Sequence, residues 1–484
     1  MNLLGRDAWK VSNKIIIFAT AVESTVVEII ILVHMKFYNR EKEIEELKRV
    51  QGLAFTRNSR MLVVTGRRRI GKTSLIKQAF KDDGSVTLYF FVGRKSESVL
   101  VSEFVGHVRE VLSVFVPEGM ISFSNLMQYL FELGKTRSFN LVIDEFQEFY
   151  NINETVFSDL QNLWDSYRQD TRVNLVICGS VFSLMQKIFT DHSEPLFGRA
   201  DNILQLRPFK VEVLKQIMEE YAPGYSNDDL LALYTITGGV PKYVELFCDN
   251  DRLTVEKMYR FVFSEMSPFL DEGRNLLITE FGKNYGTYFS ILQELANGYY
   301  TQGEIEARLG GIAIGGHLNK LENVYHLITR ERPIFAKPGS KKNVRYIIID
   351  NFLSFWFKYI EGNRSYIELQ NFDDLYHLAQ ADYPTYSGRV LEKYFRQKLA
   401  EAGGFKEIGS WWEMKSMSGK QKIEAFEIDI IALRARGNEA LVAEVKRNVN
   451  NYNHKLFMEK VEHVKQKEMA KYSIETKFFS LEDM

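Results

Sequence analysis

Residues 66–73 read GRRRIGKT, and this octapeptide constrains the chain more than any other segment. It matches the full pattern G-x-x-x-x-G-K-[ST], in which glycines let backbone N–H groups curl around phosphate oxygens. We expect Lys72 to reach the β- and γ-phosphates and the Thr73 hydroxyl to hold Mg²⁺, at the positive N-terminus of the next helix. The alternative is an arginine-rich surface turn. The pattern predicts ATP and Mg²⁺ as cofactors, bound by Gly66, Arg67, Arg68, Arg69, Ile70, Gly71, Lys72, Thr73 and Ser74.

The segments around this loop alternate between strand-like and helix-like patterns. Apolar runs over residues 61–65, 86–92, 140–143 and 173–178 predict buried strands, with helical periodicity between them. Continuous apolar runs, rather than apolar–polar alternation, are typical of parallel strands that helices cover on both faces. The predicted fold class is therefore α/β, built on the parallel sheet of a P-loop NTPase.

Two acids, Asp144 and Glu145, end the run NLVIDE at residues 140–145. Ligands of open α/β sheets bind at the carboxyl ends of the strands. We expect Asp144 to hold Mg²⁺ through water and Glu145 to orient and activate the attacking water. Alone, such a run could be a solvated strand end, but its position 72 residues after Lys72 supports the nucleotide site.

Two later positions are further candidates for this site. Ser180 follows the apolar run at 173–178 and could sense the γ-phosphate, or could belong to a simple strand-to-helix turn. Arg199, in LFGRA, is a candidate for stabilising the transition state, in cis or across the subunits of a homo-oligomer. The alternative for Arg199 is an ordinary surface arginine.

Five segments together resemble a known family. GRRRIGKTSLI, LVIDEFQEF, ICGS, LFGRA and TGGVPKYVELF, in this order, resemble the archaeal-type ATPases, P-loop proteins grouped with AAA+-like and STAND-type ATPases. FYNREKEIEEL is similar to the usual N-terminal opening of that family, and the resemblance extends over residues 36–275. It implies that Gly238, Gly239 and Pro241 belong to a helical lid near the nucleotide.

Composition excludes several other classes of protein. The chain has 484 residues, 45% of them hydrophobic and 26% charged, which excludes a disordered or collagen-like chain. Only two cysteines occur, Cys178 and Cys248, which excludes a disulfide scaffold and fits a reducing, cytoplasmic location. The net charge of -1 argues against a wholly basic nucleic-acid binder but leaves local patches open.

The first 34 residues do not fit the rest of the chain. Residues 15–33 resemble a membrane span or signal peptide, but they contain Glu23 and Glu28, each costly at bilayer depth. A globular start, MKFYNREKEIEELKRV, begins at Met35. We interpret residues 1–34 as an atypical upstream extension, with a packed helix or a membrane anchor as alternatives, and expect no clear membrane contact.

The pattern predicts four domains after this extension, the third of them a winged helix. Thr301 and Glu304 form a capping box, and two short helical patterns and a hairpin pattern follow. Lys337, Lys341 and Lys342 at the hairpin tip could contact DNA phosphates, or the segment could pack between domains. The predicted domains are a P-loop ATPase core at 35–210, a helical lid at 211–282, a winged helix at 283–360 and a nuclease-like domain at 361–484.

Near the C-terminus, two alternating segments predict half-buried strands joined by a turn around residues 436–438. A turn centred on 436/437 places Asp429 opposite Glu444, and one centred on 437/438 places Asp429 opposite Lys446. Either register puts all three on one face, because strand side chains alternate. Facing carboxylates about 5 Å apart suit a hard cation such as Mg²⁺, with Lys446 positioning or activating water.

This D…E-x-K arrangement resembles the PD-(D/E)xK, restriction-endonuclease-like nucleases. Together with GRVLEKYFRQKL and Trp411-Trp412, it looks like the C-terminal domain of unknown function often fused to archaeal-type ATPases. The resemblance implies a restriction-endonuclease-like α/β domain with Glu392 as the helical acid. One departure is that Ile428, not proline, precedes Asp429. The alternative is a set of charges on a solvated sheet face.

These patterns together indicate one function and one alternative to it. The first is a regulatory, ATP-hydrolysing ATPase coupled to a DNA-directed, metal-dependent nuclease-like domain. The alternative is an ATP-gated DNA-binding regulator or scaffold whose nuclease fold is inactive. DNA cleavage that requires a metal would separate the two.

Overall fold

The computed structural model divides the chain into two compact units, Asn39–Pro208 and Met1–Tyr38 together with Phe209–Met484. The second unit keeps residues 211–282, 283–360 and 361–484 together, so the boundaries between these three domains remain predictions. The residues that the structure describes are 14–15, 32–81, 84–282, 285–337, 339–340, 342–413, 416–418, 421–423 and 426–484.

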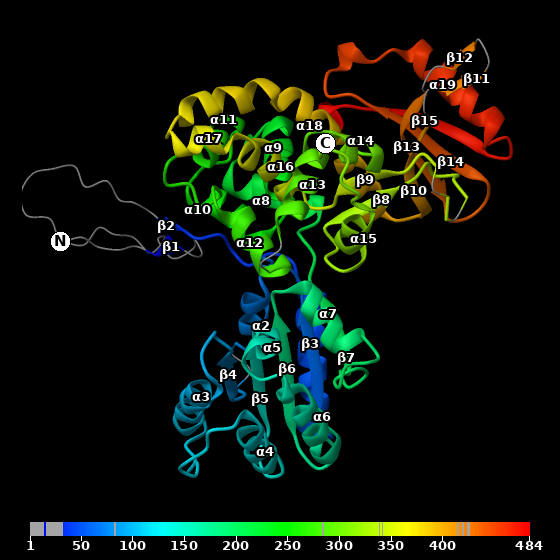
Figure 1. The fold of residues 1–484 in the computed structure, drawn as a ribbon. Helices are drawn as coiled ribbons and strands as arrows, with labels where there is room; N and C mark the ends of the chain where they lie inside the picture. The colour runs from blue at the N-terminus through cyan, green and yellow to red at the C-terminus, as the bar shows by residue number, and fades with distance from the viewer. Residues whose placement is uncertain are drawn as a thin grey trace, which may run out of the picture. The chain divides into compact units, whose positions relative to one another are not determined.

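The first unit is built on a five-stranded parallel sheet with the order β4-β5-β6-β3-β7 (Figure 1). The four predicted strands are present. A fifth strand, NILQ, was not predicted, because it is short and only half-buried at the sheet edge. The strands are β3 (Arg60–Thr65), β4 (Thr87–Phe91), β5 (Phe139–Asp144), β6 (Val173–Gly179) and β7 (Asn202–Gln205).

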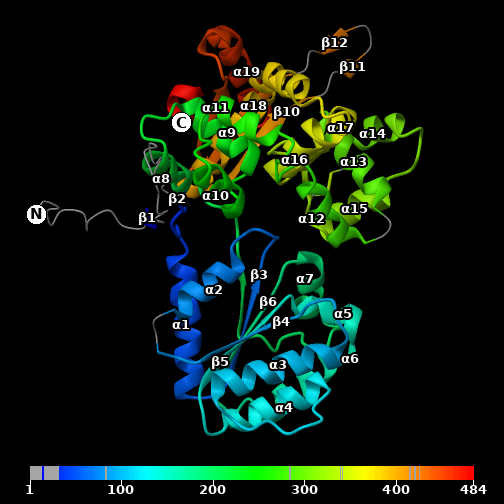
Figure 2. The ribbon, with the colours of Figure 1, turned by 90° about the vertical axis from the view of Figure 1, so that its left-hand side faces the viewer.

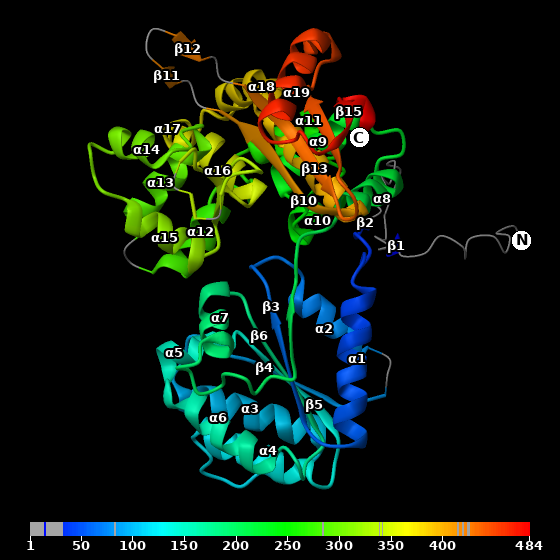
Figure 3. The same ribbon diagram turned by 90° about the vertical axis from the view of Figure 1, so that its right-hand side faces the viewer.

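Helices cover both faces of this sheet (Figure 3). Leu62 and Val64 of β3 pack with α1 and α2, whereas Met61 and Val63 belong to the core on the other face. The central strands β3, β5 and β6 are thus buried on both sides, and the parallel sheet with its helices confirms the α/β fold class. The helices are α1 (Glu41–Thr56), α2 (Lys72–Phe80), α3 (Glu97–Leu112), α4 (Phe123–Gly134), α5 (Phe149–Ile152), α6 (Thr155–Tyr167) and α7 (Phe182–Thr190), with a 3-10 turn, η1 (Phe146–Glu148).

The second unit begins with helices that share one core. The aromatic run of α16 lies in this core, where Phe355, Trp356 and Phe357 are fully buried. The elements are α8 (Val211–Tyr221), α9 (Asn227–Thr237), α10 (Pro241–Asp249), α11 (Val255–Val262), α12 (Glu272–Phe281), α13 (Gly286–Ala296), α16 (Asn351–Tyr359), η2 (Glu361–Asn363), α17 (Arg364–Glu368) and α18 (Phe372–Ala402).

Two short helices and a hairpin occupy the segment predicted as a winged helix. The capping box of Thr301 and Glu304 is present. Ile334, between the hairpin strands, donates its backbone N–H to the Ser410 carbonyl (3.0 Å) and packs with the core of the C-terminal sheet. Lys337 and Lys342 are exposed, and Lys341 lies outside the described residues. The elements are α14 (Gln302–Arg308), α15 (Gly315–Asn323), β8 (Ile328–Glu331) and β9 (Arg345–Ile348).

The C-terminal sheet has the order β10-β13-β14-β15 (Figure 1). Strand β10 and helix α19 of this part are labelled in Figure 2. Strand β15 is parallel to β14 because α19 crosses between them, and the other pairs are antiparallel. Ile430 pairs with Ala443, so the register is the one that places Asp429 opposite Glu444. The elements are β10 (Phe405–Trp412), β13 (Glu427–Arg434), β14 (Glu439–Val445), η3 (Val449–Asn451), α19 (His454–Lys467), β15 (Ser473–Phe479) and η4 (Leu481–Asp483), with a separate hairpin of β11 (Ser416–Ser418) and β12 (Gln421–Ile423).

Only four of the first 33 residues are described. They form a short antiparallel pair, β1 (Lys14–Ile15) with β2 (Leu32–Val33). The interpretation of residues 1–34 as an extension therefore falls almost wholly outside the described residues. Within the described part of the chain, no helix combines the length and apolar character needed to cross a bilayer.

Gly239 provides a test of the packing in the second unit. Its φ is +78°, and an added Cβ would lie 2.7 Å from the Phe209 carbonyl oxygen. We expect Gly239→Ala to lower the free energy of unfolding by about 1–3 kcal/mol, measured as a lower Tm. Gly316→Ala in α15 is the control, because an added Cβ there meets nothing within 4 Å. Equal Tm values for the two variants would contradict the expectation.

Candidate functional site

The phosphate loop joins β3 to α2, and two of its glycines are required by geometry. Gly71 caps α2 in the left-handed region, with φ of +89°, which glycine adopts without steric cost. A Cβ on Gly66 would lie 3.0 Å from Ile70 Cγ2 and 3.1 Å from the Leu206 carbonyl oxygen. The loop conformation therefore depends on the glycines that the motif contains.

Lys72 lies over this loop. Its ammonium donates to the backbone carbonyls of Gly66 (2.8 Å) and Arg67 (3.2 Å), and the residue is 7% exposed. Ile70 is buried beneath the loop, whereas Arg68 and Ser74 are exposed and Arg67 and Arg69 are half-buried. The loop thus surrounds a buried cation, and such a cation suits an anionic ligand.

Asp144 ends β5 and accepts hydrogen bonds from three other segments. Thr73 Oγ1 lies 3.2 Å from Oδ2, Tyr89 Oη also donates to Oδ2, and Cys178 Sγ lies 3.1 Å from Oδ1. Burial, and then the bond to Asp144, raises the pKa of Tyr89, and burial followed by the charge of Asp144 raises the pKa of Cys178. All three donors are therefore neutral at physiological pH. The Thr73 hydroxyl and the Asp144 carboxylate supply the hard oxygen atoms that Mg²⁺ prefers, so these residues fit the ion.

Glu145 and Ser180 are brought together by the same strand ends. Glu145 has a left-handed backbone, with φ of +55°, and its Oε2 accepts from Ser180 Oγ (2.8 Å) and Gln147 Nε2 (2.6 Å). An added Cβ at Gly179 would lie 2.1 Å from Gln147 Oε1, so a side chain there would force Gln147 to shift. Ser180 therefore contacts the candidate base, and its role toward a γ-phosphate remains a prediction.

Two predicted residues lie elsewhere. Arg199 pairs with Asp165 (3.0 Å) and donates to the Phe197 carbonyl (3.0 Å), neither of which belongs to the phosphate loop. Its role in cis or across subunits remains a prediction. Pro241 is the first residue of α10, in the other compact unit, so its place near the nucleotide is also a prediction.

A second cluster of charges lies in the C-terminal sheet. Asp429 on β13 and Glu444 on β14 are 8% and 5% exposed, so both carboxylates are buried. Lys446 Nζ lies 3.2 Å from Asp429 Oδ2 and 2.9 Å from Glu444 Oε1. The Val445 backbone N–H also donates to Asp429 Oδ2 (2.8 Å). The strands thus bring all three predicted residues into direct contact.

Two helices add one charge each to this cluster. Lys460 on α19 lies 2.9 and 3.1 Å from the two Glu444 oxygens. Glu392 on α18 is half-buried, and its burial, reinforced by the Asp429 carboxylate, raises its pKa to about 8. Burial and then the Glu444 carboxylate raise the pKa of Asp429 as well. For Lys446, burial would lower the pKa, but the Asp429 and Glu444 carboxylates outweigh it and raise the pKa.

Arg447 ties this cluster to the helices of the same unit. Its guanidinium pairs with Asp228 of α9 (2.7 Å), donates to Ser387 Oγ (2.8 Å) and stacks over the Tyr383 ring (4.6 Å). Tyr383 Oη donates to the same Asp228 (2.7 Å). The residue that follows Lys446 is therefore anchored to α9 and α18 at once.

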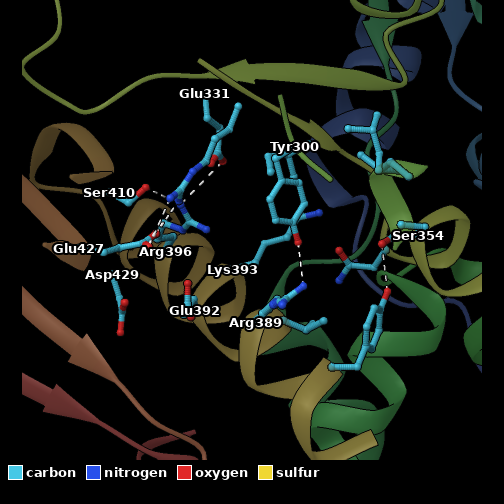
Figure 4. A pocket seen from close by; sticks show the side chains of 18 of the residues that line it. Tyr300, Glu331, Ser354, Arg389, Glu392, Lys393, Arg396, Ser410, Glu427 and Asp429 are labelled. Carbon is cyan, nitrogen blue, oxygen red and sulfur yellow. Dashed lines mark hydrogen bonds and ion pairs between the residues drawn. The ribbon is translucent and has the colours of Figure 1, made fainter. Parts of the chain in front are cut away.

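The carboxylates open into a cavity of about 490 Å³. Figure 4 shows Asp429, Glu427 and Glu392 toward one end of this cavity and the Tyr300–Arg389 pair nearer its middle. Arg345 pairs with Glu427, and Arg396 lies 3.7 Å from Glu331, so the lining alternates in charge. The basic residues of the lining are Arg345, Arg389, Lys393, Arg396, Lys446 and Lys460.

Comparisons with known proteins agree with this geometry. Residues 37–247 match the family described as an ATPase domain predominantly from Archaea, and residues 356–468 match archaeal and bacterial proteins of unknown function. Over 426 residues the chain is 30% identical to an uncharacterized protein of Methanocaldococcus jannaschii, with 85% of this chain and 87% of that one covered.

Two solved structures are similar at lower identity. The Walker-type ATPase of Pyrococcus abyssi is 18% identical, with a TM-score of 0.49 over 66% of this chain and 96% of that one. The ORC2 protein of Aeropyrum pernix is 12% identical, with a TM-score of 0.45 over 72% of this chain and 96% of that one.

The parallel sheet, the phosphate loop and the acid at the end of β5 define a P-loop ATPase. Residues 37–247 belong to the family of ATPase domains found predominantly in Archaea, and the whole chain belongs to one family with the Methanocaldococcus jannaschii relative. In its C-terminal part, residues 356–468 match a family of proteins of unknown function.

Sequence reasoning missed several residues that contact the two clusters. Tyr89 and Cys178 come from strands beside β5, and Lys460 comes from the helix after β14. Each lies within an ordinary apolar or amphipathic pattern, so no motif marks it. The one available signal was the position of Tyr89 in the strand that pairs with β5.

The raised pKa of Glu392 predicts a pH-dependent stability. Between about pH 4.5 and 8 the folded protein holds a proton that the unfolded chain has lost, so the free energy of unfolding falls as pH rises. Glu392→Gln mimics the protonated carboxyl group, so its free energy of unfolding does not show this fall with rising pH. In EDTA we expect equal Tm values near pH 5 and a higher Tm for the variant at pH 8. Each pKa unit corresponds to about 1.4 kcal/mol, or about 2–4 °C in Tm.

The control for this experiment is Glu407→Gln, at an exposed position of β10. Its melting temperature is expected to follow that of the wild type at every pH. Parallel curves for the wild type and Glu392→Gln would show that Glu392 titrates normally.

Proposed function

We propose that this chain is a Mg²⁺-dependent ATPase that uses ATP to control a metal-dependent, nucleic-acid-cleaving site in its C-terminal sheet. The observation that carries the proposal is the convergence of Asp429, Glu444, Lys446 and Glu392 around one cavity, in a chain that also has a phosphate loop. Residues that are far apart in sequence meet there with the chemistry of a hydrolytic site.

In the ATPase unit, the loop backbone and Lys72 hold the phosphates, and Thr73 and Asp144 hold Mg²⁺. The ion supplies charge neutralisation of the phosphate oxygens when bound. Glu145 orients the attacking water, and its hydrogen bond from Ser180 supports a shared role for the two residues at the γ-phosphate. Arg199 completes the site across a homo-oligomer.

The free and buried thiols of Cys178 and Cys248 support a reducing cytoplasm as the location of this protein.

Lys72→Ala tests the nucleotide site. Because the ammonium is the buried cation of the loop, we expect this variant to lose ATP binding and hydrolysis by at least about a hundredfold. Isothermal titration with ATP and Mg²⁺ measures binding, and phosphate release measures turnover. Lys77→Ala on the exposed side of the same helix is the control and keeps both activities. If Lys72→Ala still binds ATP tightly, the loop is not the nucleotide-binding site.

In the C-terminal unit, Asp429 and Glu444 provide carboxylate oxygens for a divalent cation. Lys446 holds the attacking water beside the scissile phosphate. Glu392 keeps its proton near neutral pH, because its pKa is raised to about 8, and can donate it to the leaving oxygen. These roles give each member of the cluster a part in phosphodiester hydrolysis.

DNA cleavage tests these assignments. With Mg²⁺ or Mn²⁺ present, we expect the wild type to cut DNA and both Asp429→Ala and Lys446→Ala to lose at least about a hundredfold in rate. Lys406→Ala, at an exposed position of β10, serves as the control. Products are scored on gels with and without ATP. Cleavage unchanged in both variants would exclude this cluster as the active site.

A second candidate function is an ATP-gated binder of nucleic acid that does not cut. One observation favours it: Glu444 is already paired with two lysines, Lys446 and Lys460, so a metal ion must displace an ammonium group. The packing of Ile334 against the C-terminal sheet also supports a structural use of the hairpin. The same assay separates the two functions, because the binder retains DNA without cutting it.

A further inference from the structure

The carboxylate cluster lies between two hollows of the same compact unit. The first is the cavity of about 490 Å³, and the second, of about 460 Å³, is lined by the middle of α18, the last residue of β14 and residues that follow it. Arg389, Glu392 and Lys446 belong to both linings. The two hollows therefore adjoin at these three residues, and we call the pair of hollows the path.

The two hollows are too small to admit a nucleic-acid duplex. Each hollow falls within the range of about 300–1,000 Å³ that is typical of pockets for small ligands. The major groove of a DNA duplex alone is about 12 Å wide, so a duplex does not enter either hollow. A single strand presents one nucleotide at a time and fits such a volume.

Because Asp429 and Glu444 are buried, a phosphate group must enter a hollow to reach them. Asp429 is 8% exposed and Glu444 is 5% exposed, so a phosphate on the outer surface does not reach them. A phosphodiester must instead enter a hollow to come near the carboxylates. Single-stranded nucleic acid meets this requirement, whereas an intact duplex does not.

Arg389 is the cation that this path offers to such a strand. Among the residues that the structure describes, no carboxylate pairs with Arg389, and its guanidinium donates to Tyr300 Oη (3.0 Å). It lies one helical turn before Glu392 on α18, so the two side chains share a face. The other arginines of the cavity, Arg345 and Arg396, each face a glutamate. Arg389 thus has free donors for a phosphate beside the acid cluster.

We propose that the path binds single-stranded nucleic acid, which runs from one hollow to the other, and that Arg389 binds a phosphate next to the one at Asp429 and Glu444. This inference rests on the proposed function, because it names the substrate class of that site. It also makes a prediction about binding alone, which does not require cleavage.

The test measures binding by the full-length chain in an Asp429→Asn background, so that cleavage does not interfere. Fluorescence anisotropy compares a labelled single-stranded oligonucleotide with a duplex of the same sequence in Mg²⁺. We expect the single strand to bind at least about tenfold more tightly, and Arg389→Gln to weaken its binding by about tenfold, the loss expected for one charged hydrogen bond. Arg389→Lys retains the charge and restores part of the affinity.

The control is Arg436→Gln, an exposed arginine in the turn between β13 and β14, which leaves the affinity within about twofold. Equal affinity for single strand and duplex, or unchanged binding in Arg389→Gln, would overturn the inference. A cleavage assay of the chain with Asp429 intact is run in parallel. Selective, Arg389-dependent binding without any cleavage would reject the proposed nuclease and leave the single-strand path in place.

Discussion

A carboxylate buried at the end of a strand must find hydrogen-bond donors, and both sites of this chain are built around that constraint. Asp144 accepts hydrogen bonds from the Thr73 hydroxyl, the Tyr89 phenol and the Cys178 thiol, all of them neutral. Asp429 finds a backbone N–H and the ammonium of Lys446. The hydroxyl, phenol and thiol that donate to Asp144 carry no charge, whereas Asp429 is paired with the charged Lys446. The two sites differ in how readily a cation enters them.

The second site is also held in place by its surroundings. Arg447, next to Lys446, pairs with Asp228 of α9 and stacks on Tyr383 of α18. A displacement of α9 relative to Arg447 and α18 breaks the partly buried Arg447–Asp228 pair and the hydrogen bond from Tyr383 to Asp228, which is costly. Helix α9 ends at Thr237 and is capped by Gly238, in the segment that resembles the family's lid. The carboxylate cluster and the lid-like helices thus belong to one physically connected unit.

The sequence predicts what depends on local pattern and leaves out what depends on distant contacts. The phosphate loop and the capping box of Thr301 are local, so both appear in the fold as expected. The pairing of Asp429 with Glu444 depended on the turn, and the sequence left two registers open until the structure chose one. Tyr89 and Lys460 reach the sites across tertiary contacts, and no spacing in the chain reveals them. Arg199 pairs with Asp165, so the motif located the residue without its partner, and its role at the nucleotide remains a prediction.

The net charge of -1 now has a structural explanation. Duplex-binding proteins gather unpaired cations on an outer surface, because phosphates on a rod are reached from outside. Here the cations near the acid cluster lie in a cavity, and most are paired internally, as Arg345 is with Glu427. A strand that enters such a cavity meets few cations, but it meets them away from bulk water, where each contact is stronger. The proposed binding of a single strand therefore does not require a basic surface, because it relies on Arg389, which has no carboxylate partner among the described residues, placed beside the acids.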